Sequence, residues 1–173
     1  SMKVVKIDSK VFVGKEIIHA SVFKKKDSRT IYNMIYTDGK SGYSMMKRFN
    51  VSSITRNKDY FLTKSEKSSK VIYFTANPNG EAETITIHLR KLQKLKILKF
   101  DYDFADLAIK GKGSVGNILT KNKVKKIELR SEGVSTLSAR KIWFDKNVRR
   151  LNVDERGELL GDFAANDKIL SIN

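Results

Sequence analysis

A lysine- and glycine-rich stretch near the middle of the chain holds the groups whose chemistry is easiest to interpret. It covers residues 107–129 and reads LAIKGKGSVGNILTKNKVKKIEL. Its glycines are Gly111, Gly113 and Gly116, and its lysines are Lys110, Lys112, Lys121, Lys123, Lys125 and Lys126. Glycine lets a backbone adopt positive φ and approach another molecule closely, and ammonium groups neutralise phosphates. The stretch therefore predicts a loop that offers amides and cations to a polyanion and then enters a strand at 125–129.

The same glycines spell a dinucleotide-binding pattern, G-x-G-x-x-G, over residues 111–116. That pattern requires a preceding strand and a helix that opens through it, so that the helix N-terminus holds the pyrophosphate. The following residues, NILTKNKV, are partly β-branched and show no helical stripe. A P-loop is excluded because Asn117 and Ile118 stand where Lys and Ser/Thr are required. A dinucleotide enzyme is therefore the weakest of the functional alternatives.

Positive charge is distributed unevenly along the 173 residues. The chain has 35 Lys and Arg against 19 Asp and Glu, a net charge of +16. Residues 1–100 hold 21 basic and 8 acidic side chains (+13), residues 107–150 hold 12 and 3 (+9), and residues 151–173 hold 2 and 5 (−3). Such an excess indicates a polyanionic partner, most often nucleic acid. The competing interpretation is a solvated basic surface that only keeps the protein soluble.

The candidate DNA-binding residues are basic side chains that lie near predicted turns. They are Lys47, Arg48, Arg56, Lys58, Lys110, Lys112, Lys121, Lys123, Lys125, Lys126, Arg140, Lys141, Arg149 and Arg150. Gly111, Gly113 and Gly116 are the positions where the backbone would approach the ligand. Contacts of this kind go to phosphates, so we expect binding that is largely independent of sequence.

Other residue types predict structure rather than chemistry. There is no Cys, hence no disulfide scaffold or Cys-based zinc site. No catalytic constellation is recognisable, and no metal site is expected. His19 and His88 are predicted to be structural, and Asp101, Asp103 and Asp106 to cap a neighbouring basic loop, because a calcium loop would need a Gly and a terminal Glu. The aromatic residues lie in predicted strands, so we expect core packing for Tyr36, Tyr43, Phe49, Tyr60, Phe61, Phe74, Phe100, Phe104, Trp143 and Phe144.

Short alternating runs separated by turn residues predict an all-β fold. The expected strands are 17–23, 31–36, 43–49, 60–63, 71–75, 83–89, 95–100, 125–129, 141–144, 148–153 and 158–163. A further strand is expected to begin at 167–172, which suggests that the chain is part of a longer protein. The spacing of Leu89, Leu92, Leu95 and Leu98 also fits a short helix, although we favour a linker that enters a strand.

Turns recur with a period near forty residues, at 38–40, 78–80, 121–123 and 154–157. A period near forty with about four short strands each is typical of blade-like β repeats. We therefore expect residues 1–173 to form a single domain of about four blades.

Several segments resemble the C-terminal domain found in the A subunits of bacterial type IIA topoisomerases. They are YTDGK at 36–40, MKRF at 46–49, DYFLTK at 59–64, VIYFT at 71–75, the loop 110–117, VRRLN at 148–152 and LGDF at 160–163. The resemblance covers most of the chain from about residue 15. It is closest to DNA topoisomerase IV, with the corresponding domain of DNA gyrase as a near relative.

The resemblance implies a β-pinwheel, a propeller-like array of four-stranded antiparallel blades with duplex DNA bent around a basic rim. It also implies a non-catalytic role, in which the domain steers the choice of DNA segment for an ATP-dependent topoisomerase. The gyrase box QRRGGKG is missing, and 109–113 is the nearest stretch. This departure favours the topoisomerase IV type and argues against active supercoiling.

The same resemblance sets the expected partners. These are double-stranded DNA, the N-terminal part of the same polypeptide and the ATPase B subunit of a heterotetramer. We expect no cofactor in this domain, because the parent enzyme would bind ATP and Mg²⁺ elsewhere. A cytoplasmic, nucleoid-associated location is expected, without a membrane. The alternative from another functional class is a β-repeat scaffold that binds an acidic protein partner, which a large exposed apolar patch would favour.

Overall fold

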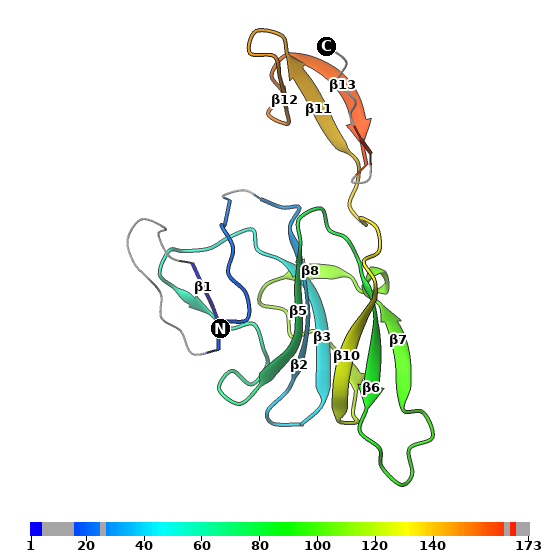
Figure 1. Cartoon of the computed structure of the whole chain (residues 1–173). Helices are drawn as coiled ribbons and strands as arrows, with labels where there is room; N and C mark the ends of the chain where they lie inside the picture. Colours follow the sequence, from blue (N-terminus) through cyan, green and yellow to red (C-terminus); the bar gives the residue numbers. More distant parts are fainter. Residues whose placement is uncertain (5–15, 25–26, 165–166, 169–173) are drawn as a thin grey trace.

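The computed structural model describes residues 1–4, 16–24, 27–164 and 167–168, and within these ranges the protein is all-β (Figure 1). The elements are β1 (Met2–Lys3), β2 (Ile31–Thr37), β3 (Ser44–Asn50), β4 (Asp59–Tyr60), β5 (Lys70–Asn77), β6 (Thr84–Leu89), β7 (Lys99–Asp103), η1 (Phe104–Asp106), β8 (Ile109–Gly111), β9 (Asn117–Thr120), β10 (Val124–Ser131), β11 (Arg140–Asp145), β12 (Arg150–Asn152) and β13 (Glu158–Phe163). The expected all-β class is confirmed, and η1 is a single 3₁₀ turn.

The strands form four sheets of unequal size. The first sheet has the order β5-β2-β3-β8, and β9 joins it by pairing with β3 beside β8. The second is β10-β6-β7, the third is β12-β11-β13, and β1 pairs with β4. Strand β8 runs parallel to β3, unlike the other pairs. The pairing therefore differs from the expected set of uniform four-stranded antiparallel blades.

The hairpin predicted at residues 37–40 is confirmed. Strands β2 and β3 pair without a register shift from Ile31 opposite Asn50 to Thr37 opposite Ser44. Asp38 closes the turn, since its carboxylate accepts hydrogen bonds from the Ser41 amide at 3.0 Å and the Ser41 hydroxyl at 2.6 Å. An Asp side chain that bonds to the backbone ahead of it is a common device in turns.

The turns near 78–80, 121–123 and 154–157 do not form hairpins, unlike the turn between β2 and β3. They connect β5 to β6, β9 to β10 and β12 to β13, and none of these consecutive strands pairs with the other. Strand β6 pairs with β10 and β7, β10 pairs with β6, and β13 pairs with β11 rather than with the strand that precedes its turn. Turn residues mark where the chain reverses, but they do not say which strand the chain pairs with next.

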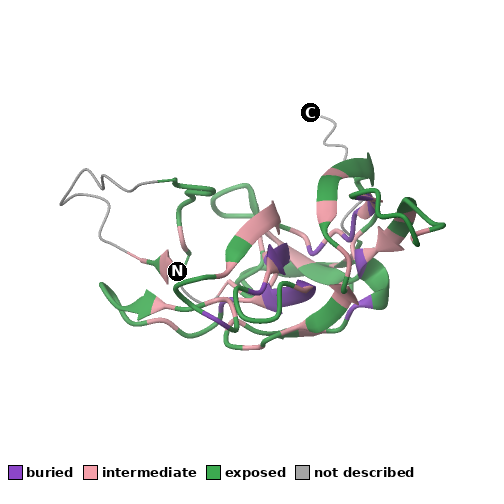
Figure 2. Cartoon of the chain, turned by 90° about the horizontal axis from the view of Figure 1, so that it is seen from below, coloured by how far each residue is buried: buried purple, intermediate pink, exposed green. Residues whose placement is uncertain are grey.

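The core lies in the first two sheets. Strand β6 buries Ile85, Ile87 and Leu89 on alternate positions, as its apolar/polar alternation predicts. These residues pack with Phe104 and Leu107, while a second cluster centres on the hairpin β2–β3. Among the described residues none after Leu107 is buried. Figure 2 shows the buried positions gathered in the body of the molecule.

Several strand boundaries differ from those expected. The run 17–23 is not a strand, and 60–63 shrinks to β4. The segment 89–98 contains a turn, so neither a helix nor an early strand forms, and β7 starts at Lys99. Strands β8 and β9 form inside the predicted loop, because the free edge of β3 offers backbone partners to it. The strand expected at 167–172 lies outside the described residues apart from its first two.

Candidate nucleic-acid interface

The glycine-rich segment lies along one edge of the first sheet. Strand β8 pairs with residues 48–50 of β3, and the chain then turns back so that β9 pairs with residues 44–46 of the same strand. The loop 112–116 connects them without a helix. This geometry confirms that 111–116 is not a dinucleotide-binding turn, since that motif needs a helix at this position.

Lys47 is an anchor beneath this loop, which corrects its expected role as a DNA ligand. Its side chain is buried, and its Nζ donates to the carbonyl oxygens of Leu62 at 2.9 Å, Lys112 at 2.7 Å and Ser114 at 2.6 Å. These acceptors use all three ammonium donors. Burial lowers the pKa of Lys47 to about 8. A lysine in this position cannot reach a phosphate outside the protein.

Two further contacts hold the loop against β3. The Tyr36 hydroxyl donates to the Val115 carbonyl at 2.7 Å. Gly116 has φ of 90°, and a Cβ atom there would lie 2.3 Å from the Met46 carbonyl oxygen. Of the three glycines expected to need positive φ, only Gly116 does; Gly111 and Gly113 have ordinary φ and open space around them. The loop therefore turns its carbonyls inward, onto protein donors.

Tyr60 brings together two basic residues that are distant in sequence. The Nζ atoms of Lys58 and Lys112 lie 5.6 Å and 4.9 Å from the centroid of its ring. Its hydroxyl accepts a hydrogen bond from the Thr55 amide at 2.6 Å. That hydrogen bond lowers the pKa of Tyr60, and the two lysines act in the same direction. The ring thus brings together one cation from the residue that precedes β4 and one from the glycine-rich loop.

Two further lysines of the segment lie beside this sheet edge. Lys110 is exposed on β8 opposite Phe49, and Lys121 follows β9 with its Nζ 5.6 Å from the Tyr43 ring centroid. The partners of Lys110 and Thr120 on β3 are five residues apart, which corresponds to about 17 Å along a strand. Duplex DNA carries one charge per about 1.7 Å of axis, so a contact of this length passes about ten phosphates.

We call this set the basic strip: Arg56, Lys58, Lys110, Lys112, Lys121 and Lys123. Lys112 is partly covered, and the other five are exposed. Within the described residues none of the six forms an ion pair with a carboxylate. Their charges are therefore uncompensated, and the strip is a cationic edge that can accept an anionic polymer.

Arg48 is the second predicted ligand that the structure removes from the surface. It is buried, and its Nη2 donates to the Gly80 carbonyl at 2.8 Å and to the Thr136 hydroxyl at 2.7 Å. Burial lowers its pKa, while the carboxylates of Glu83 and Asp103 oppose that shift. Arg48 thus ties β3 to segments that lead into and out of the second sheet.

The basic residues of β10 lie on a different surface and are largely neutralised. Lys126 forms an ion pair with Glu128 at 2.7 Å, and Glu128 also contacts His88. Arg130 forms an ion pair with Asp101 on the far strand of the same sheet. Lys125 is exposed at a register shift. The acid–base pairs make this face a mixed-charge surface, distinct from the basic strip.

The last four candidate residues belong to the third sheet. Arg140 and Lys141 begin β11, whereas Arg149 and Arg150 lie at the turn into β12, and all four are exposed. In Figure 1 this sheet stands apart from the body that carries the strip. The structure therefore buries two of the predicted ligands, Lys47 and Arg48, and divides the others among three surfaces.

Sequence reasoning assigned the aromatic residues too uniformly to the core. Tyr36, Phe49 and Phe104 are buried, and Tyr43, Phe74 and Phe100 are partly buried and pack against the core clusters, as expected. Phe61 is half exposed, and the half-buried ring of Tyr60 contacts two lysines. The nearness of Lys58 to Tyr60 in the sequence is the signal that could have indicated this contact, since the other lysine, Lys112, is 52 residues away.

Two negative findings concern the part of the chain that is described. No cluster of three His, Cys, Asp or Glu side chains there could hold a metal ion. No helix in those residues is long and apolar enough to cross a membrane. Asp101 and Asp103 have structural contacts, with Arg130 and with the amide of Ala105 respectively.

The comparisons with known proteins agree with a DNA-related class. A family model described as the topoisomerase C-terminal domain of Bacteroidota matches residues 1–132. The chain therefore belongs to this family of topoisomerase C-terminal domains. The matched residues end just after β10, so the third sheet lies outside the match. Searches of curated proteins and of solved structures find no match.

Proposed function

We propose that this protein binds duplex DNA without sequence preference, through the basic strip. The observation that carries the proposal is that, within the described residues, none of the strip's cations forms an ion pair with a carboxylate, whereas Lys126 and Arg130 of β10 do. A surface of unpaired Lys and Arg releases counterions from DNA when it neutralises phosphates, and this release drives binding.

Two further observations support a DNA partner. The net charge of +16 attracts polyanions over long range, and the family is that of topoisomerase C-terminal domains. In the finer form of the proposal, the chain is the C-terminal domain of the DNA-cleaving polypeptide of a topoisomerase IV-type enzyme. There it bends DNA and steers the choice of DNA segment. The rest of that polypeptide and the ATPase B subunit cleave the DNA and bind ATP and Mg²⁺, and the enzyme acts in the cytoplasm.

The test is charge reversal on the strip. The variant Lys58→Glu, Lys110→Glu, Lys121→Glu changes three exposed side chains that make no ion pair within the described residues. We expect it to weaken binding to all duplex sequences alike and to reduce the salt slope by about one for each lost phosphate contact. The measurement is fluorescence anisotropy of a labelled duplex between about 50 and 200 mM salt.

A matched control reverses the same charge elsewhere. Lys91, Lys94 and Lys96 are exposed in the segment between β6 and β7, so their triple Glu variant has the same net charge as the strip variant. We expect the control to lose much less affinity. An equal loss in both variants would mean that net charge alone governs binding, and it would remove the strip from its assigned role.

The bending component has a separate measurement. A duplex labelled at both ends with a donor and an acceptor should gain energy transfer when the wild-type protein binds. If the duplex binds without a change in energy transfer, the proposal that the protein binds DNA is kept and the proposal that it bends DNA is contradicted.

One observation favours protein binding as a second role. The third sheet exposes large apolar side chains, including Val148 at 60% and Leu159 at 49%. Soluble proteins rarely leave contiguous apolar patches without a function. Binding of a protein partner to the third sheet should protect the amides of β11–β13 from hydrogen exchange. Binding of DNA to the basic strip should leave the exchange of these amides unchanged.

A further inference from the structure

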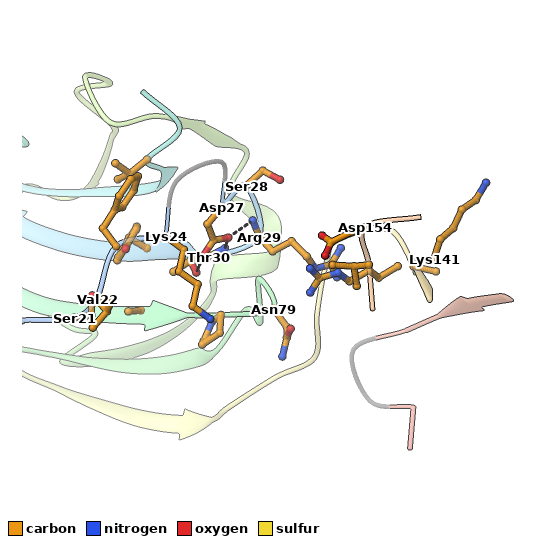
Figure 3. Close-up of a pocket in the computed structure, with 18 of the residues that line it drawn as sticks. Ser21, Val22, Lys24, Asp27, Ser28, Arg29, Thr30, Asn79, Lys141 and Asp154 are labelled. Atoms are coloured by element: carbon orange, nitrogen blue, oxygen red, sulfur yellow. Dashed lines mark hydrogen bonds between the residues drawn. The ribbon is translucent and has the colours of Figure 1, made fainter. Parts of the chain in front are cut away.

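A hollow separates the N-terminal segment from the third sheet (Figure 3). One wall consists of residues 19–24 and 27–30 with parts of β2 and β5, and the other carries Arg140, Lys141 and Trp143 of β11. Its volume is about 1110 Å³. That is slightly above the range for pockets that hold small molecules, roughly 300–1,000 Å³.

Cations line both walls of this hollow. Lys24 and Arg29 come from the N-terminal side, and Arg140 and Lys141 from β11. Figure 3 shows Arg29 extending toward the wall that carries Asp154, with Lys141 directed outward at the rim. These four residues belong neither to the basic strip nor to the core.

The two acids of the hollow are already engaged. Asp27 accepts hydrogen bonds from the amides of Arg29 and Thr30 at 2.9 and 3.1 Å and from the Thr30 hydroxyl at 2.7 Å. Asp154 forms an ion pair with Arg156 at 3.0 Å. The guanidinium of Arg29 donates one hydrogen bond from an Nη atom to the Ser138 carbonyl. Its Nε atom is buried and has no hydrogen-bond partner among the described residues. The hollow therefore has donors in excess of acceptors.

An aromatic ring lies in the same hollow. Trp143 is half buried on β11, and it is the single tryptophan of the chain. Tyr32 lines the opposite wall, but it is already stacked with Phe49 and Phe74 at 5.4 and 5.7 Å. Trp143 has no such ring partner among the described residues. Phe23 also lines the hollow, but it packs against the cluster centred on β2–β3. Trp143 is therefore the ring that we assign to a ligand.

We propose that this hollow binds a short stretch of single-stranded nucleic acid, with a base on Trp143 and phosphates on Lys24, Arg29 and Arg140. A cationic channel with an aromatic platform is the arrangement that holds unpaired strands, because any base can stack and the backbone supplies the negative charge. This site is separate from the basic strip and from its proposed duplex partner.

Trp143 provides a direct readout of the site. Titration with an oligothymidylate of about eight nucleotides, within the range of known site sizes, should quench the fluorescence of this tryptophan saturably. The variant Lys24→Glu, Arg140→Glu changes one cation on each wall, and we expect its affinity to fall about tenfold or more. Arg150→Glu, Lys125→Glu is the control, because it has the same charge change at exposed positions that do not line the hollow.

A second variant keeps the test independent of the fluorescence signal. Trp143→Leu removes the ring, and binding of a labelled oligothymidylate followed by anisotropy should weaken by about tenfold. Far-UV circular dichroism of each variant checks that the fold is retained. The strip variant Lys58→Glu, Lys110→Glu, Lys121→Glu should lose duplex binding and keep the tryptophan quenching, so the two sites are distinguished.

Three results would overturn the inference. The first is unchanged fluorescence at saturating oligothymidylate. The second is equal loss of affinity in the control and in the Lys24→Glu, Arg140→Glu variant. The third is saturable quenching by an oligoglutamate peptide but not by the oligonucleotide, which would assign the hollow to an acidic protein segment.

Discussion

The ammonium group of Lys47 donates a hydrogen bond of 2.6 Å to the carbonyl oxygen of Ser114, a residue 67 positions away in the sequence. The contact joins the centre of β3 to the loop between β8 and β9. Lys47 is therefore a buried structural group and not a surface ligand. The loop that it holds keeps Lys112 and the flanking lysines, Lys110 and Lys121, in a fixed place. One cation is thus used to position others.

Replacing Lys47 with Met should destabilise the protein by about 3 kcal/mol. The change keeps the apolar stem but leaves three carbonyl groups without their donor, and hydrogen bonds to a charged group contribute about 1.5–3 kcal/mol each. The net loss is smaller than their sum because the change also removes the cost of burying a charge. Urea denaturation gives the free energy of unfolding. The exposed Lys110→Met is the control and should stay within about 0.5 kcal/mol of wild type. If Lys47→Met instead left stability unchanged and weakened DNA binding, the lysine would be a surface ligand after all.

The glycines of the loop should differ sharply in their tolerance of a side chain. Gly116→Ala forces alanine into positive φ, a strain of about 1–3 kcal/mol, and places its Cβ against the Met46 carbonyl. Gly113→Ala meets no atom within 4 Å and has ordinary φ, so it should be neutral or slightly stabilising. Thermal unfolding of the two single variants compares them directly. Equal melting temperatures would contradict the loop conformation.

The sequence was sufficient to predict the strands that form the core. Alternation in residues 83–89 and the Asp-Gly turn after Thr37 predicted β6 and the β2–β3 hairpin, because side-chain periodicity and turn chemistry are local properties. Pairing partners are not local. Nothing in residues 109–120 shows that both β8 and β9 would use the same edge of β3, so the segment was interpreted as an open loop.

The candidate site was predictable in composition but not in geometry. Charge counts identified the basic segments, yet they could not distinguish the buried Lys47 and Arg48 from the exposed Lys110, since all lie in or beside strands near turns. The difference depends on which carbonyl groups surround each side chain after folding. Likewise Tyr60 looked like a core residue, because the cation that covers it, Lys112, comes from a segment 52 residues later in the sequence.

Acidification should weaken the hairpin through Asp38. Hydrogen bonds from Ser41 lower the pKa of this buried carboxyl group below its ordinary value of 3.8. A lowered pKa means that the unfolded chain binds the proton more readily, so the stabilisation is complete above the ordinary pKa and is lost as pH falls toward the folded-state value. The stability difference between wild type and Asp38→Asn should therefore be constant near neutral pH and shrink below about pH 4.

The control for this prediction is Asp59→Asn, a change at an exposed carboxylate in the short strand β4. Denaturation curves of the three proteins at several pH values provide the data. A wild-type advantage over Asp38→Asn that grew on acidification would have the wrong sign and would exclude the proposed hydrogen bonding.

Tyr60 offers a way to separate the arrangement of cations from their number. Tyr60→Leu removes the ring beneath Lys58 and Lys112 but no charge, and an exposed cation–π contact contributes about 0.5–1 kcal/mol. We expect duplex affinity to fall about two- to tenfold, while the slope of log K against log salt stays the same because as many phosphates are neutralised. Tyr60→Phe keeps the ring and should bind nearly as wild type. Phe61→Leu, at an exposed neighbour, controls for loss of aromatic surface. A salt slope reduced by one or more in Tyr60→Leu would mean that a lysine had left the DNA, and affinity unchanged in Tyr60→Leu would mean that the ring does not position the strip.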